Sequence, residues 1–269
     1  MSAGEQDVTR AIVRRGAVAL EVLAQGRGQT VVLLPSLGRG ARDFEPIAAT
    51  IAAAGFRVLR PQPRGIGAST GPACSDLQDC AADIAAVIET EGGAPAFVAG
   101  HAFGNRVARM LATNRPGLVE AVSLIAANVG KAPSPPDVRA AIRASADPSL
   151  SRESRLQALR FAFFAPGNDP TPWLEGWHPE VLSAQRTAGD RTARSLDYAG
   201  GAAPILYLQP DHDPLAHVED AEIFRRENGA RVKVTVIPNA SHAAITEQPA
   251  FISAALIEYA RGLWLSQEP

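Results

Sequence analysis

Two polar segments towards the C-terminus contain side chains that could move a proton. The first, Q-P-D-H-D-P, contains Asp211 and Asp213, and the second, P-N-A-S-H, contains His242. An imidazole can accept a proton near neutral pH, since its unperturbed pKa is about 6.5. A buried carboxylate beside the ring would fix its tautomer and stabilise the imidazolium. These residue types predict general-base chemistry, and they leave open which aspartate contacts the histidine.

A third segment, V-A-G-H-A-F-G-N at residues 98–105, joins a short apolar run to the start of a helical pattern. Gly100 and Gly104 favour a tight turn between a strand and a helix, where larger residues would not fit. Ala102 lies at the centre of this turn, and its methyl group cannot attack a carbonyl carbon. The segment therefore predicts a strand-to-helix turn that has no nucleophile at its centre.

No metal or cofactor site is predicted. Cys74 and Cys80 are six positions apart and lack a C-x-x-C spacing or a second pair. The D-H-D sequence at residues 211–213 has no further ligands at a spacing suited to a metal ion.

Alternating strands and helices would have to position these segments. Short apolar runs predict strands at residues 30–34, 56–59, 95–99, 119–126, 204–208 and 232–237. Helical spacing of apolar residues predicts helices at 43–54, 77–91 and 251–264, with Asp43 as the cap of the first. This order implies right-handed crossovers and a parallel sheet. Residues 11–14 and 18–23 predict an antiparallel hairpin at one edge.

The strand pattern is lost between residues 127 and 201, where helical periodicity occurs at 138–145 and 152–164. This stretch is predicted to be a helical insertion between two strands of the sheet. It contains Phe163, Trp173 and Trp177. These aromatic side chains either pack the insertion onto the sheet or line an apolar substrate pocket.

Taken in chain order, these segments resemble the α/β-hydrolase superfamily. G-H-A-F-G is similar to the nucleophile elbow G-x-S-x-G, with Ala102 in place of serine. The resemblance identifies Asp213 as the acid and His242 as the base, and Asp211 is the alternative acid. It implies an α/β fold with a mostly parallel central sheet of about eight strands flanked by helices. Residues 1–269 would form a single domain, with residues 127–201 as a helical cap.

The resemblance also implies an oxyanion hole made of two backbone amides, those of Phe103 and Leu37. The loop P-S-L-G-R-G that contains Leu37 departs from the more usual H-G-x pattern. Ser36 is then either a polar side chain near the reacting centre or an ordinary turn residue. The segment R-G-I-G-A-S, which begins at Arg64, resembles a loop that supports the elbow in this superfamily.

Three accounts of Ala102 remain open. It could replace a serine in a deliberately inactivated enzyme, or it could be the natural residue of a protein that binds its ligand without cleaving it. In the third account, His242 and Asp213 act on water or on a substrate proton without covalent catalysis. The resemblance predicts an enzyme that hydrolyses small-molecule esters, thioesters, amides or carbon–carbon bonds, but it does not select one of these reactions.

Composition limits the possible partners. The 269 residues are 46% apolar, which is enough for one large core. A formal net charge of −2 argues against nucleic acid as a partner. The sequence contains no apolar run of about 18 residues, so no membrane span is predicted, and a cytoplasmic location is expected. The expected partner is a small molecule with an apolar acyl or ring portion.

Overall fold

The computed structural model describes residues 8–129 and 135–265, and its centre is an eight-stranded sheet in the order β1-β2-β4-β3-β5-β6-β7-β8. The strands are β1 (Thr9–Arg15), β2 (Val18–Gln25), β3 (Thr30–Leu34), β4 (Arg57–Pro61), β5 (Ala96–His101), β6 (Val119–Ile125), β7 (Ile205–Pro210) and β8 (Val232–Ile237). Strand β2 is antiparallel to both β1 and β4, and every other neighbouring pair is parallel.

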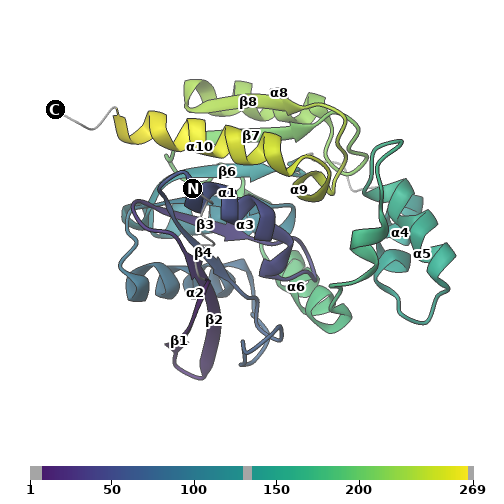
Figure 1. Ribbon diagram of the computed structural model, residues 1–269, viewed down its shortest axis with the longest axis horizontal. Helices are drawn as coiled ribbons and strands as arrows, with labels where there is room; N and C mark the ends of the chain where they lie inside the picture. The colour runs from purple at the N-terminus through teal and green to yellow at the C-terminus, as the bar shows by residue number, and fades with distance from the viewer. Residues whose placement is uncertain (1–7, 130–134, 266–269) are drawn as a thin grey trace, which may run out of the picture.

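Helices cover both faces of this sheet (Figure 1). The longer helices are α1 (Glu45–Ala53), α2 (Leu77–Glu91), α3 (Phe103–Asn114), α4 (Pro136–Ala146), α5 (Arg152–Ala162), α6 (Pro179–Arg191), α8 (Val218–Asn228) and α10 (Pro249–Leu265). Short helical turns are η1 (Ala41–Phe44), η2 (Pro116–Leu118), η3 (Thr171–Leu174), α7 (Arg194–Asp197), η4 (Gly229–Arg231) and α9 (Ala244–Glu247). Apolar side chains of α2, α3 and α8 form one core with the sheet, and those of α1 and α10 form a second core on the opposite face. The central strands β3 and β5 are buried along their whole length, which explains their continuous apolar sequences.

The predicted fold class is confirmed, because the sheet has eight mostly parallel strands with helices on both faces. The predicted helix at 77–91 and the strands at 30–34 and 232–237 agree with α2, β3 and β8 at both ends. The hairpin is confirmed as β1 and β2, although both strands are longer than predicted.

The predicted cap at Asp43 is wrong. Helix α1 begins at Glu45 after the turn η1, and its N-cap residue, Phe44, makes no side-chain cap bond. The Asp43 carboxylate instead accepts a hydrogen bond from Arg39 Nη2 at 2.9 Å. The Asp43 carboxylate that could have capped the helix is therefore bound to the buried guanidinium of Arg39.

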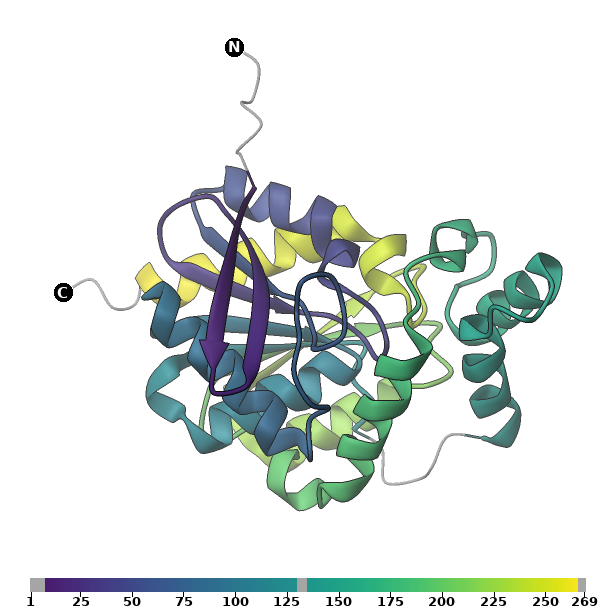
Figure 2. The ribbon, with the colours of Figure 1, turned by 90° about the horizontal axis from the view of Figure 1, so that it is seen from below.

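Helices α4 to α7 and the turn η3 lie between β6 and β7 in the sequence. Figure 1 and Figure 2 both place α4 and α5 at one side of the molecule, away from the hairpin of β1 and β2. These two helices form a small apolar core of their own with Phe163, Phe164 and Trp173. Helices α4 and α5 are cap-like. A cap that extends over residues 127–201 remains a prediction, and residues 130–134 within this range lie outside the described residues.

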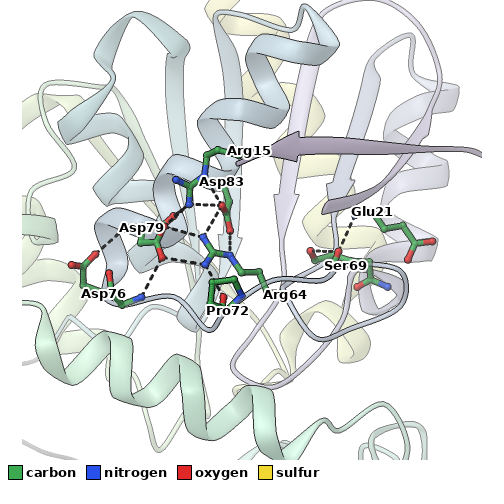
Figure 3. Close-up of polar contacts among 10 residues, drawn as sticks. Arg15, Glu21, Arg64, Ser69, Pro72, Asp76, Asp79 and Asp83 are labelled. Atoms are coloured by element: carbon green, nitrogen blue, oxygen red, sulfur yellow. Dashed lines mark hydrogen bonds and ion pairs between the residues drawn. The ribbon is translucent and has the colours of Figure 1, made fainter. Parts of the chain in front are cut away.

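Arg64 anchors the loop that follows β4 (Figure 3). Its guanidinium binds Asp83 at 2.6 and 2.8 Å, Asp79 at 2.9 Å and the carbonyl of Pro72 at 2.8 Å. Arg15 of β1 binds the same Asp83 at 2.9 Å. Burial alone would raise the pKa of Asp79, but hydrogen bonds from Arg64 and Arg15 outweigh it and lower that pKa. The cluster ties the hairpin and the loop to α2, which is a structural role for Arg64.

Candidate active site

The turn between β5 and α3 is where the sequence predicts a nucleophile elbow. Ala102 has φ 48° and ψ −109°, a backbone conformation that costs a non-glycine residue free energy. A Cβ at Gly104 would lie 2.3 Å from the carbonyl oxygen of Leu34, and one at Gly100 would lie 2.3 Å from the Gly104 backbone. The Asn105 side chain donates to the Ala102 carbonyl. Close packing therefore holds the strained turn and explains both glycines.

His242 and Asp213 meet above the ends of the parallel strands. Asp213 follows β7 and His242 follows β8, so the parallel order brings their loops to one edge of the sheet. His242 Nδ1 lies 2.8 Å from Asp213 Oδ2, and the Asp213 side chain has no exposed surface. The other carboxylate oxygen accepts the amides of Leu215 at 2.8 Å and Ala216 at 3.1 Å.

A carboxylate can only accept hydrogen bonds, so this contact assigns the proton of a neutral His242 to Nδ1. The lone pair of the ring is then on Nε2. Within residues 8–129 and 135–265, His242 Nε2 has no hydrogen-bond partner. The arrangement therefore leaves one ring nitrogen of His242 able to accept a hydrogen bond.

Asp211, the alternative acid, does not contact His242. Its carboxylate accepts the amides of Asn239 at 3.0 Å and Ala240 at 3.1 Å, and it also binds His212. Burial would raise the pKa of Asp211, but these hydrogen bonds outweigh burial and lower it. Asp211 therefore shapes the loop that carries His242.

Glu247 holds the same loop from the other side, and sequence reasoning missed it. Its carboxylate accepts the amides of Ser241 and Ala165, both at 2.7 Å, and the Asn168 side chain at 2.8 Å. Burial raises the pKa of Glu247 above its usual value. The sequence A-I-T-E gives no sign of this role, because two of the partners are backbone amides and two, Ala165 and Asn168, are distant in the chain.

The amides predicted to form an oxyanion hole are both unengaged. In the ranges that the structure describes, neither Leu37 N nor Phe103 N donates a hydrogen bond. Phe103 is the first residue of α3, where an amide has no acceptor within its own helix. Leu37 lies in a tight turn closed by a 3.2 Å bond from Arg39 N to Ser36 O, and Gly38 follows it with φ 67°.

A cavity of about 210 Å³ brings the predicted groups together. It is lined by most of the predicted site residues, namely Ser36, Leu37, Ala102, Phe103, Phe163, Trp177 and His242. Asp213 lies behind His242. Asn105, Arg106 and Asn128 add polar atoms that the sequence analysis did not propose.

Trp173 does not line this cavity, which corrects its predicted place in the substrate pocket. It is 1% exposed, and its indole nitrogen donates to Thr246 Oγ1 at 2.7 Å. Its ring packs against Phe163, Phe164 and Trp177 at centroid distances of 5.3 to 5.7 Å. The two interpretations of the aromatic cluster therefore divide: Phe163 and Trp177 face the cavity, and Trp173 packs the helical region together.

Residues 31–255 match the model of the alpha/beta hydrolase family. The chain belongs to this family. It is 36% identical over 102 residues to a protein of Mycobacterium tuberculosis assigned as the non-heme bromoperoxidase BpoC. It is also 30% identical over 109 residues to a protein of Variovorax paradoxus assigned as the carbamate hydrolase RutD. The matched stretches span 38–39% of this chain and only 39–40% of these curated relatives.

Solved structures extend the likeness of this alpha/beta hydrolase to nearly its full length. The esterase EaEST from Exiguobacterium antarcticum superposes with a TM-score of 0.78 at 20% identity, covering 94% of this chain and 100% of the esterase. The crystal structure of BpoC gives a TM-score of 0.76 at 22% identity, covering 97% and 98% of the two chains. At these identities the comparisons show the fold.

In the described part of this alpha/beta hydrolase, no group of three or more His, Cys, Asp or Glu side chains could hold a metal ion. Within the same residues, no helix is both long and apolar enough to cross a membrane.

The loop that contains Leu37 is held in place by the helical region between β6 and β7. Arg39, which is 2% exposed, lies with its guanidinium carbon 4.4 Å from the ring centroid of Trp173 and 4.9 Å from that of Trp177. It also donates to the carbonyl of Glu175 at 3.0 Å. Gly38 makes two hydrogen bonds to the same helical region. Its amide donates to Gln185 Oε1 at 2.7 Å, and its carbonyl accepts the amide of His178 at 2.9 Å.

Arg39→Ala is therefore expected to lower the free energy of unfolding by about 3 kcal/mol, because it leaves the Asp43 carboxylate without its partner and removes the contact with two indole rings. Urea denaturation measures the loss. Arg42→Ala on the neighbouring exposed arginine is the matched control. Equal stability of the two variants would contradict a role for Arg39 as a clamp.

His101, beside Ala102, is fully buried and holds the His242 loop. Its Nε2 donates to the His242 carbonyl at 2.7 Å, and its Nδ1 has no partner in the described residues. Burial, together with the nearby His242 and Arg39, lowers the pKa of His101 to about 3, against the opposing effect of the hydrogen bond. The imidazole is therefore neutral in the folded protein.

This depressed pKa predicts how stability changes with acid. Between pH ~6.5 and the folded-state pKa of about 3, the unfolded chain binds a proton at His101 that the folded chain does not. Stability therefore falls as pH falls through this window, by roughly tenfold in the folding constant per pH unit. His101→Gln removes this contribution, and urea denaturation between pH 6 and pH 4 is expected to give a shallower dependence. Parallel pH profiles for the two proteins would show that His101 is protonated in the fold.

Proposed function

We propose that this chain binds a small acyl compound, an ester, thioester or amide, in a hydrolase-type site that lacks only the nucleophilic oxygen. The observation that carries the proposal is the backbone of Ala102, which keeps the strained elbow conformation at φ 48°. This conformation costs alanine free energy without a benefit to alanine itself, and the close packing at Gly100 and Gly104 maintains it. Such strain is typical of a position from which a side chain is presented to a bound substrate.

The carbonyl oxygen of the bound compound would accept hydrogen bonds from Leu37 N and Phe103 N. Both residues line the cavity that Ala102 and His242 also line, and neither amide donates a hydrogen bond within the described residues. Donors fixed in this way stabilise the negative charge that develops on a carbonyl oxygen under attack. His242 would take the proton of the attacking group through Nε2, while Asp213 holds the ring. With a methyl group at position 102, the site binds and orients the compound but forms no acyl-enzyme.

Related proteins support a carbonyl substrate by analogy. The similar structures include a protein named as an esterase, and the curated relatives include one assigned as a carbamate hydrolase. The substrate class of this chain rests on its own two donors and its base, because the curated alignments span only 38–39% of the chain.

Binding without turnover tests the proposal on the chain as it stands. Isothermal titration calorimetry with phenyl butyrate is expected to give saturable binding, with phenol release no faster than in buffer. Ile142→Trp places a larger side chain on the cavity wall and is expected to weaken binding at least about tenfold. Arg143→Trp, on the exposed neighbouring position of α4, is the matched control and retains affinity. No saturable binding, or equal binding by both variants, contradicts the proposal.

One observation favours a second function, in which the base acts alone. His242 Nε2 has no protein partner among the described residues, and the ring lines the cavity, so it could take a proton directly from a bound substrate or from water. Nuclear magnetic resonance in heavy water would detect deuterium exchange next to the carbonyl of butanone. His242→Ala abolishes this exchange if the base acts alone, and an unchanged rate rejects the idea.

A further inference from the structure

A second cavity, of about 270 Å³, lies on the other side of the elbow, between the sheet, α2, α3 and α6. We refer to it as the α6 cavity. Its walls are largely apolar and include Leu20, Leu34, Ile84, Val107, Val181 and Ala184. A cavity of this size and composition is suited to an apolar ligand group.

The charged side chains in these walls favour an uncharged occupant. Arg64 and Asp83 bind each other at 2.6 and 2.8 Å, so neither is left for a charged ligand (Figure 3). The remaining charged wall residue is Glu180, which is exposed and would repel an anion. Gln185 uses its carbonyl oxygen to hold the amide of Gly38.

The α6 cavity meets the candidate active site at the two predicted oxyanion donors. Phe103 lines both cavities. Pro35 lines the α6 cavity, and the next two residues, Ser36 and Leu37, line the active-site cavity. A carbonyl group held by Leu37 N and Phe103 N would therefore lie at the boundary between the two spaces.

From this geometry we infer that the α6 cavity binds an apolar arm of the same molecule whose carbonyl group lies at Leu37 and Phe103. The inference rests on the proposed function, and it specifies the substrate as a carbonyl compound with apolar substituents on both sides. One substituent lies towards Phe163 and Trp177, and the other lies between Val107 and Ala184. The Phe103 side chain, at the junction, limits how wide the connecting part of the ligand can be.

A series of methyl ketones from butanone to nonanone tests the inference, because ketones need no nucleophile in order to bind. Calorimetry is expected to show affinity rising about fourfold for each added methylene until the cavity is filled. Ala184→Leu narrows the α6 cavity and removes this gain for the longer ketones. Ser183→Leu, on the exposed neighbouring position of the same helix, is the matched control and keeps the gain.

The unaltered chain provides a second readout that needs no wall variant. Cys74 is half-buried and lines the α6 cavity. Nonanone is expected to slow alkylation of Cys74 by iodoacetamide, whereas butanone leaves the rate unchanged. Peptide mass spectrometry after digestion separates Cys74 from Cys80.

The outcomes separate the two proposals. Binding of butanone that does not strengthen with chain length, or a gain that survives Ala184→Leu, overturns the α6-cavity inference and leaves the proposed function standing. A complete absence of ketone and ester binding overturns the proposed function, and the inference with it. Affinity that rises with chain length, depends on Ala184 and protects Cys74 supports both.

Discussion

Ala102→Ser is expected to create hydrolysis of short acyl esters in a chain that otherwise binds them without turnover. The elbow already holds position 102 at φ 48°, so a serine there adds one oxygen atom without a change of backbone. His242 Nε2 is available to take the hydroxyl proton, and Leu37 and Phe103, whose amides are unengaged, line the same cavity. Loss of the serine costs on the order of 10⁶-fold in related triads, and this sets the upper limit of the gain.

Steady-state release of p-nitrophenolate from p-nitrophenyl butyrate measures the gain. Ser36→Ala in the Ala102→Ser background tests whether the neighbouring hydroxyl contributes, and only a small effect is expected from a turn residue. A folded Ala102→Ser protein that releases p-nitrophenolate no faster than the unaltered chain would show that the site is no longer arranged for acyl transfer.

The second large effect concerns the acid. In the Ala102→Ser background, Asp213→Asn is expected to lower kcat about 10⁴-fold, because an amide at this position favours the wrong tautomer of His242. His242→Ala is expected to lower it at least as far, since no other histidine or carboxylate lines the cavity among the described residues. The losses are measured as kcat for p-nitrophenyl butyrate.

Asp211→Asn is the matched control for Asp213→Asn. Asp211 accepts the backbone amides of Asn239 and Ala240 and makes no contact with His242, so an asparagine that keeps one acceptor is expected to change kcat less than about tenfold. Equal losses in the two variants would mean that the loop as a whole, and not the Asp213 carboxylate, supports the base.

Local patterns made most of the fold predictable. The apolar run at β3 specifies a buried strand, the alternating V-K-V-T-V at β8 specifies a strand, and the spacing in α2 specifies an amphipathic helix, all without reference to the rest of the chain. The site could be predicted to a similar degree, since parallel strands bring the loops after β5, β7 and β8 to one edge. The roles given to Ala102, Asp213 and His242 remain proposals that the experiments above test.

Long-range partners explain what the sequence did not predict. Arg39 packs against two indole rings 134 and 138 positions away, those of Trp173 and Trp177, and it also binds the Asp43 carboxylate that was predicted to cap a helix. Glu247 binds backbone amides, which carry no side-chain signature in the sequence. The residue types alone left Asp211 and Asp213 open, because both follow the same strand; the family resemblance favoured Asp213, and it is Asp213 that contacts His242.

The central claim is that this site is complete except for one oxygen atom at position 102. Intact-protein mass spectrometry of the Ala102→Ser variant, acid-quenched within milliseconds of mixing with p-nitrophenyl butyrate, tests it most directly. The claim predicts a butyryl adduct on Ser at position 102, with a burst of p-nitrophenolate equal to the enzyme concentration. A folded variant that binds the ester and shows neither adduct nor burst would contradict it.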